Sequence, residues 1–146
     1  MLATGFPYTN YSRMEEYMRV FEFCMRNTRG LRRLGSAAAD LAYTACGRLD
    51  GFFEYGLNAW DVAGGALLVE EAGGVVADFS GERDFIFGQE IVACNKAVFD
   101  EFMEVIYASF KSKNDKSPTT IFTTRCANKS VATCIAYCAC RWLFFV

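Results

Sequence analysis

Apolar side chains recur every three or four residues in four stretches of the chain, and short apolar runs lie between these stretches. The helical spacing predicts helices over 12–27, 36–46, 59–70 and 97–110. Ser12 and Glu15 have the spacing of a capping box, and Gly47 and Gly73 follow the second and third helices as stop signals. The short apolar runs predict strands over 31–34, 51–56, 75–77 and 91–94. Strands that alternate with helices in this way indicate an α/β fold, a layered sheet with flanking helices.

Composition narrows the classes of function. Of 146 residues, 53% are hydrophobic and 16% are aromatic, which argues against a disordered chain. A net charge of −2 argues against a generic nucleic-acid binder, which needs a dense positive surface. The chain has no histidine, so Ser-His-Asp and Cys-His catalysis and most zinc sites are excluded. Carboxylates, backbone amides and metals that prefer oxygen remain as the available chemistry.

Charge and glycine content divide the chain near residue 110. Residues 1–110 carry nine basic and sixteen acidic side chains, a net of −7, whereas residues 111–146 carry six and one, a net of +5. All twelve glycines lie at or before Gly88, and the polar run 111–118 has the composition of a linker. We therefore predict one domain over 1–110 and a separate, poorly structured tail over 111–146. The four cysteines of the tail have no histidine and no paired C-x₂-C, which is a poor zinc pattern.

The chain has the features of a cytoplasmic protein. No secretory signal opens the sequence, and the apolar end 131–146 is too short to span a bilayer and contains Arg141. Cys24, Cys46 and Cys94 lie far apart in apolar runs, where buried free thiols in a reducing compartment explain them better than disulfides. We expect no membrane partner.

The first junction of chemical interest is the run Gly35-Ser36-Ala37-Ala38, which directly follows a predicted strand. Small residues let a ligand approach the backbone, and the free amides of a first helical turn favour an anion or a polyol oxygen. Small residues also occur wherever a helix packs tightly on a sheet, so the run alone leaves both interpretations open.

The second junction is Asn58-Ala59-Trp60-Asp61, at the start of a helix that is apolar nearly all round. A carboxylate in the first turn is favoured by the helix dipole, and Mg²⁺ prefers such hard oxygen ligands. A capping role for Asp61 is an equally good explanation. Glu54, in the strand just before this helix, could accept hydrogen bonds from a hydroxylated ligand, although by strand alternation an outward orientation is the commoner case.

Taken together, these residues resemble a known family. Four runs of the sequence, in this order and spacing, are similar to the C-terminal half of inositol monophosphatases. They are 35–38, Gly47-Arg48-Leu49-Asp50-Gly51-Phe52-Phe53-Glu54, Trp60-Asp61-Val62-Ala63-Gly64-Gly65-Ala66 and Glu70-Glu71-Ala72-Gly73-Gly74. The similarity extends from about Gly5 to about Phe110, and it implies the C-terminal lobe of an αβαβα sandwich. It also implies that Asp61 is a Mg²⁺ ligand that touches the substrate, that Glu54 accepts inositol hydroxyls, and that Gly35, Ser36 and Ala37 line the substrate. In the family, Mg²⁺ polarises the phosphate ester and activates a water, which requires no histidine.

The sequence lacks features that the family's earlier half supplies, a metal-binding Glu and a D-P-x-D-G-T motif. One carboxylate does not hold a cluster of Mg²⁺ ions. We therefore expect no catalytic residue of its own in this chain and negligible hydrolysis of inositol monophosphate or a similar sugar phosphate by the chain alone. The alternative is a non-catalytic substrate-pocket or dimerisation lobe, or the product of a truncated gene. Surfaces that the earlier half would cover predict a homodimer or other self-association.

Overall fold

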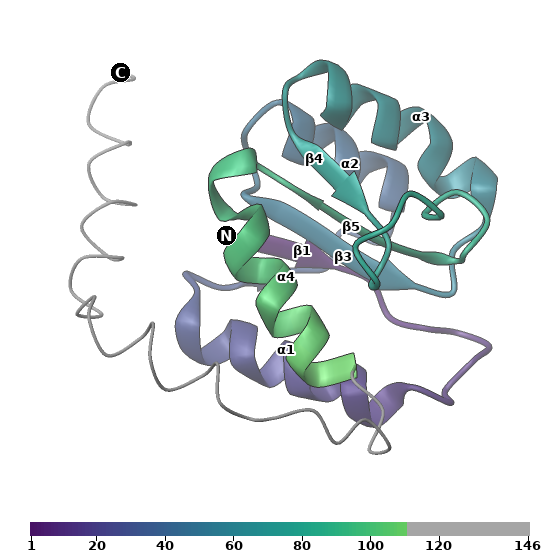
Figure 1. Cartoon of the computed structure of the whole chain (residues 1–146), viewed down its shortest axis with the longest axis vertical. Helices are drawn as coiled ribbons and strands as arrows, with labels where there is room; N and C mark the ends of the chain where they lie inside the picture. The colour runs from purple at the N-terminus through teal and green to yellow at the C-terminus, as the bar shows by residue number, and fades with distance from the viewer. Residues whose placement is uncertain (111–146) are drawn as a thin grey trace. The chain divides into compact units, whose positions relative to one another are not determined.

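A five-stranded mixed sheet forms the centre of the part of the chain that the computed structural model describes, residues 1–110 (Figure 1). The strands are β1 (Leu2–Thr4), β2 (Leu31–Arg32), β3 (Gly51–Tyr55), β4 (Val75–Ala77) and β5 (Glu90–Cys94), and the helices are α1 (Met14–Asn27), α2 (Ala37–Ala45), α3 (Ala59–Glu71) and α4 (Lys96–Phe110). The strand order is β2-β1-β3-β5-β4. β1 runs parallel to β2 and β3, whereas β5 runs antiparallel to β3 and β4. This arrangement confirms the predicted α/β class, and the predicted tail lies outside the described residues.

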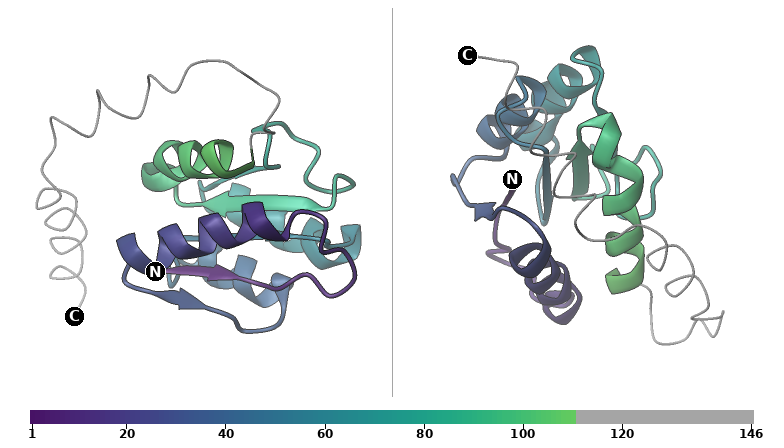
Figure 2. Two further views of the ribbon diagram at one scale, coloured as in Figure 1. Left: turned by 90° about the horizontal axis from the view of Figure 1, so that it is seen from below. Right: turned by 90° about the vertical axis from the view of Figure 1, so that its left-hand side faces the viewer.

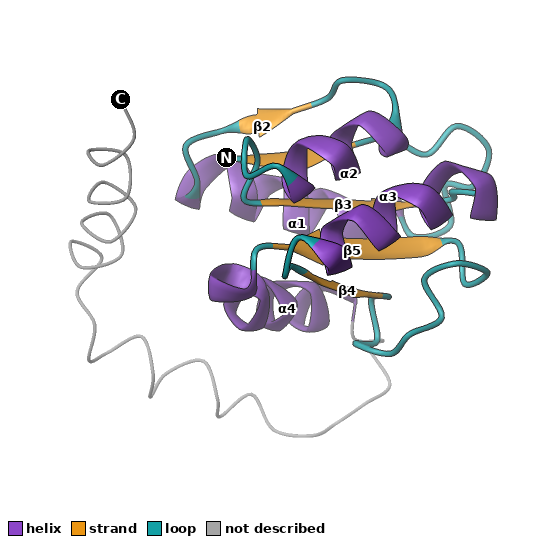
Figure 3. Cartoon of the chain, turned by 90° about the horizontal axis from the view of Figure 1, so that it is seen from above, coloured by secondary structure: helices purple, strands orange, loops and turns teal. Residues whose placement is uncertain are grey.

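The helices form two layers, one on each face of the sheet. α2 and α3 cover one face, and α1 and α4 cover the other (Figures 1 and 2). The crossover from β1 to β2 and the crossover from β2 to β3 run in opposite directions along the sheet. Since parallel crossovers are nearly always right-handed, their helices α1 and α2 must lie on opposite faces. Figure 3 shows α2 and α3 side by side in front of the strands.

Each face of the sheet has its own hydrophobic core. The core under α1 and α4 is aromatic, with the rings of Tyr17, Phe53 and Phe102 packed at centroid distances of 5.4–5.6 Å. The core under α2 and α3 contains Phe52, Phe85 and smaller aliphatic side chains. There, Gly65 allows close packing of the two helices, because an added Cβ would lie 2.6 Å from the side chain of Leu41. No helix of residues 1–110 is long and apolar enough to cross a membrane.

The structure corrects several sequence-based predictions. β1 was not predicted, and its three residues are defined as a strand by pairing with β2 and β3, which lie far along the chain. The capping box was wrong, since α1 begins at Met14 and the Ser12 hydroxyl donates to Asn10 Oδ1 at 2.7 Å. The strand predicted over 31–34 ends at Arg32. Cys24 and Cys94 are buried as expected, but Cys46 is exposed because it follows the last residue of α2.

Candidate functional site

The residues predicted to form a site lie around the carboxyl ends of the three parallel strands. β1 and β3 are neighbours in the sheet, and they lead to helices on opposite faces, α1 and α3. In open α/β sheets, ligands bind outside the carboxyl ends of strands at such a reversal, because the two departing chains leave a crevice. Gly5 directly follows β1, and Glu54 lies near the end of β3. The topology alone therefore selects the neighbourhood of Glu54 as the candidate site.

The Glu54 side chain is buried on the α2–α3 face, with 7% of the residue exposed. The neighbouring residues Phe53 and Tyr55 belong to the opposite core, so strand alternation places Glu54 with Phe52. The expectation that it would more commonly point outward was wrong, because both faces of β3 are covered. The pKa of Glu54 is raised to about 7, chiefly by burial and then by the negative charges of Asp40 and Asp61, while the positive charge of Arg33 opposes the shift. Glu54 can therefore either donate or accept a proton near neutral pH.

A hydrogen-bonded network fixes the end of β1 beside Glu54. The Tyr17 hydroxyl donates to the Gly5 carbonyl oxygen and lies 2.6 Å from Thr4 Oγ1. Thr4 Oγ1 in turn donates to the Phe53 carbonyl at 2.7 Å. On the other face, the Glu54 carboxyl lies against the bare α-carbon of Gly5, where any added methyl would overlap it. Gly5 is therefore required by close approach, and no local pattern signals this requirement because Glu54 lies far along the chain.

Asp61 lies in the first turn of α3, partly exposed, and its Oδ2 accepts a hydrogen bond from the Asn58 backbone N–H at 3.0 Å. The capping role that the sequence allowed is therefore present. Trp60 points into solvent with 80% of its surface exposed, so it does not bury the carboxylate. The negative charge of Asp61 makes a small contribution to the raised pKa of Glu54.

Residues Gly35, Ser36 and Ala37 form the entry to α2. Gly35 has φ +90°, a conformation that favours glycine, and Ser36 is the N-cap, whose side chain accepts from the Ala39 N–H at 3.4 Å. Ala37 is buried against the α2–α3 core. Asp40 lies one turn further along α2, where its N–H donates to the Ser36 carbonyl at 2.9 Å, and its negative charge contributes to the raised pKa of Glu54.

Asp40 was not predicted from the sequence, although it is the most deeply buried acidic residue of the described chain. Only 1% of it is exposed, and its Oδ1 has no hydrogen-bond partner among the described residues. The pKa of Asp40 is raised to about 6, because the effect of burial outweighs the opposing positive charge of Arg33. A charged residue in the buried stripe of an otherwise apolar helix was the available signal.

The arrangement can accept hydrogen bonds, but within residues 1–110 it is not a complete metal centre. No group of three acidic, cysteine or histidine side chains in this part of the chain could hold a metal ion. Mg²⁺ binds through several oxygen ligands, and one oxygen of Asp61 is already engaged in capping. Asp61 fits as one ligand of a site that other residues complete, and no catalytic step can be derived through a metal from these residues alone.

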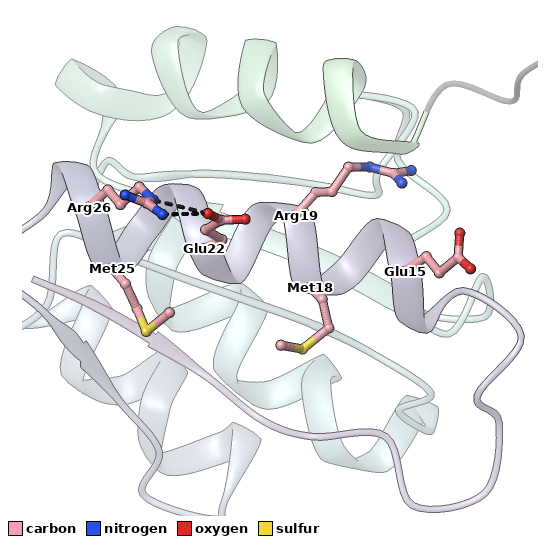
Figure 4. A pocket seen from close by; sticks show the side chains of 6 residues that line it. All are labelled: Glu15, Met18, Arg19, Glu22, Met25 and Arg26. Atoms are coloured by element: carbon pink, nitrogen blue, oxygen red, sulfur yellow. Dashed lines mark hydrogen bonds and ion pairs between the residues drawn. The ribbon is translucent and has the colours of Figure 1, made fainter.

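Two hollows on the surface of residues 1–110 are lined by residues other than the predicted site residues. The one shown in Figure 4 is lined by side chains of the single helix α1, namely Glu15, Met18, Arg19, Glu22, Met25 and Arg26. The second is lined by Arg13, Phe79, Ser80, Tyr107 and Phe110. Neither hollow is lined by Glu54, Asp61 or residues 35–37.

Comparisons with known proteins show the family. The Inositol monophosphatase family matches residues 1–114. A protein of Neisseria meningitidis named Putative Nus factor SuhB is 44% identical over 108 residues, which are 74% of this chain and 41% of that protein. The Nus factor SuhB of Escherichia coli K12 is 48% identical over 98 residues, covering 67% of this chain and 37% of that protein. The chain belongs to the inositol monophosphatase family.

Solved structures support the same assignment. The native crystal structure of suhB from Bartonella henselae aligns with a TM-score of 0.67 at 39% identity, covering 72% of this chain and 40% of that one. The inositol monophosphatase of Anabaena aligns with a TM-score of 0.64 at 37% identity, covering 73% and 42%. The chain thus spans about two fifths of the length of the curated relatives it matches.

Proposed function

We propose that residues 1–110 are the substrate-binding part of a Mg²⁺-dependent phosphomonoesterase that acts on inositol monophosphate or a similar sugar phosphate. The observation that carries the proposal is Glu54, a buried carboxyl at the β1–β3 reversal, followed by the helix that carries Asp61 in its first turn. An ionised, water-excluded carboxylate accepts hydrogen bonds from hydroxyl groups strongly. Membership of the family supplies the reaction class, and the residues supply the part of the site that they can form.

Each residue has a definite role in this proposal. Glu54 accepts hydrogen bonds from ring hydroxyls, and its carboxyl is held in place by contact with Gly5. The helix entry at Gly35, Ser36 and Ala37 lets the substrate approach the backbone, as the small side chains allow. Asp61 is the Mg²⁺ ligand that residues 1–110 provide, and the metal, when bound, supplies polarisation of the ester and an activated water. The remaining ligands come from the part of the family fold that this chain does not match.

Ligand binding and turnover test the proposal separately. Inositol monophosphate with Mg²⁺ should shift the amide resonances of Ser36, Glu54 and Asp61 in the full chain, while phosphate release stays negligible. Asp61→Asn should abolish the Mg²⁺ dependence of these shifts, and Asp100→Asn, an exposed carboxylate on α4, should leave it unchanged. Equal shifts in wild type and Asp61→Asn, or none in wild type, would exclude the proposed site. Turnover matching that of a complete enzyme would contradict the prediction that the chain alone is inactive.

A second candidate is a non-catalytic lobe that acts through a partner or through self-association. The observation that favours it is the identity of 44–48% to proteins named Nus factors, together with the incomplete acidic site of residues 1–110. Under this function the chain binds no sugar phosphate, so the same titration with inositol monophosphate distinguishes the two candidates. The prediction of no nucleic-acid partner stays a prediction under either.

A further inference from the structure

Asp40 is a buried carboxyl to which the proposed function gives no role. Only 1% of the residue is exposed, and its Oδ1 has no hydrogen-bond partner among residues 1–110. Its backbone is fixed on both sides, because its N–H donates to the Ser36 carbonyl at 2.9 Å and its carbonyl accepts from Thr44 Oγ1 at 2.9 Å. A buried carboxyl without a partner costs free energy. A site therefore explains Asp40 better than the stability of the fold does.

The topology places Asp40 over the end of β3. β2 and β3 are both parallel to β1, and α2 connects them, so α2 must run from the carboxyl ends of these strands back toward their amino ends. Asp40 lies in the first turn of α2, on the buried side that packs against β3. Glu54 is the fourth of the five residues of β3, and its side chain lies on the same face of the sheet. Two buried carboxyls therefore meet at one corner of the α2–α3 core.

Three charged groups of residues 1–110 act on Glu54, each from a different segment. They are Asp40 in α2, Arg33 in the loop before α2 and Asp61 in the first turn of α3, in order of decreasing effect. Arg33 is exposed, so water screens its positive charge. On the opposite face of the sheet, burial raises the pKa of Tyr17 in α1, so its hydroxyl stays neutral and adds no charge. Asp40 is therefore the charge that most affects the proton on Glu54.

We propose that Asp40 is the positioning residue of Glu54: the two carboxyls share one proton near neutral pH, and the charge of Asp40 sets when Glu54 can accept a hydrogen bond from a substrate hydroxyl. Two carboxyls enclosed in one place do not both ionise easily, so their protons leave in two steps. Asp40 ionises first, with a pKa of about 6, and Glu54 follows with a pKa of about 7. Asp40 is thus already charged when Glu54 titrates, whereas Glu54 is still neutral when Asp40 titrates. The proposal rests on the proposed function, because it takes Glu54 as the hydroxyl acceptor.

The titration of Glu54 in the full chain tests the pairing without any substrate. The carboxyl carbons of Asp40 and Glu54 are followed by NMR as the pH is raised from about 4 to about 9. Asp40→Asn keeps the shape of the side chain and removes its charge, so the midpoint for Glu54 should fall by about half a pH unit or more. An unchanged midpoint would overturn the proposal, because a merely structural role of Asp40 changes the stability of the chain and not the proton on Glu54.

The matched control is Asp78→Asn. Asp78 is also buried, at 6% exposed, but its Oδ1 accepts hydrogen bonds from two backbone N–H groups, and it is not among the charges that act on Glu54. This variant should leave the Glu54 midpoint in place. Wild type alone keeps the test decisive if Asp40→Asn does not fold, since each of the two carboxyl signals should then show both titration steps. Two independent single steps would overturn the proposal.

Binding of inositol monophosphate with Mg²⁺ at about pH 6 tests the consequence for the site. Asp40→Asn should bind about two- to threefold more tightly than wild type, because Glu54 is ionised in a larger fraction of the molecules. The phosphate of the ligand also titrates near pH 6, but it does so equally for every variant, so the ratio of dissociation constants is compared. A shifted Glu54 midpoint with unchanged affinity would overturn the positioning role. A shifted midpoint without binding at any pH would instead reject the proposed function and leave the pairing of the two carboxyls in place.

Discussion

The two helix layers on the same sheet differ in how they meet water. The α1–α4 layer is amphipathic, with mixed charges outside and an aromatic core inside. Arg13, which precedes α1, makes two contacts that hold this layer in place. It forms an ion pair with Glu90, and its guanidinium lies 4.4 Å from the centre of the Phe110 ring at the end of α4. The α2–α3 layer has the opposite character. It is apolar outside and contains two buried carboxyl groups, Asp40 and Glu54, beneath it.

The two faces of the sheet therefore have different explanations, stability alone for the α1–α4 face and function for the α2–α3 face. Burial of apolar area explains most of the α1–α4 face without reference to any ligand, and the Tyr55 hydroxyl is its one buried side-chain group without a hydrogen-bond partner among the described residues. On the α2–α3 face, the buried carboxyls and the exposed Leu67 and Leu68 both cost free energy in the isolated chain. Features that destabilise a fold and gather in one place indicate a site or an interface.

The largest expected effect is on the α1–α4 side. Phe53→Ala should lower the free energy of unfolding by about 3–5 kcal/mol, because Phe53 is fully buried between Tyr17 and Phe102 and its removal leaves a cavity. Urea denaturation measures the change, with Met18→Ala on the exposed side of α1 as a control that should change little. A loss under about 1 kcal/mol would show that this core is not tightly packed.

On the α2–α3 side, removing a charge should stabilise the chain. The pKa of Glu54 is raised from 4.5 to about 7 in the folded state, so the folded chain holds this proton more tightly than the unfolded chain. The resulting cost of ionisation is absent well below pH 4.5, grows as the pH rises, and is complete above pH 7. Glu54→Gln should therefore raise the free energy of unfolding by about 3 kcal/mol at pH 8 and by little at pH 4. Equal effects at both pH values would mean that the carboxyl is solvated.

A smaller effect is expected where the two faces meet, at Gly5. Gly5→Ala places a methyl where the Glu54 carboxyl lies, and the Tyr17 hydroxyl holds the Gly5 carbonyl so that β1 cannot shift away. We expect a loss of about 1–3 kcal/mol in stability, as for other overpacked positions, and loss of the sugar-phosphate shifts at Glu54. Thermal unfolding and the same amide titration measure the two effects. Unchanged titration in a folded Gly5→Ala chain would show that the position of Glu54 does not matter for binding.

Most elements of the fold could be predicted from the sequence because their signals are local. Asn58, Gly47 and Gly73 delimit helices through caps and stops, and the periodicity between them identified all four helices to within two residues. The capping box at Ser12 failed because Asn10 engages that hydroxyl instead, a competition that spacing does not reveal. β1 was missed because only its partners β2 and β3 define so short a strand.

The site residues stay a prediction. Family motifs selected Glu54, Asp61 and residues 35–37, and the charge of Asp61 contributes to the raised pKa of Glu54. Gly5 was not found, because its importance arises from contact with Glu54 across the sheet and not from neighbours in the chain. Asp40 was not found either, although a charged residue in the buried stripe of α2 was a local signal. Whether the predicted residues bind substrate depends on their contacts with residues distant in the chain, which a local sequence pattern does not describe.

The smallest expected effect distinguishes the two sides of α3. Gly64 lies on the exposed side of α3 with no atom within 4 Å of an added Cβ, so Gly64→Ala should stabilise the isolated chain by about 0.5–1 kcal/mol through reduced backbone entropy in the unfolded state. Gly65→Ala is the matched control one residue away, where the added Cβ would lie 2.6 Å from Leu41, and it should destabilise instead. Thermal unfolding of both variants measures the difference. Opposite signs would show that one side of α3 is packed within this chain and the other is free, whereas destabilisation by both would mean that the chain already covers the exposed side of α3, as self-association would.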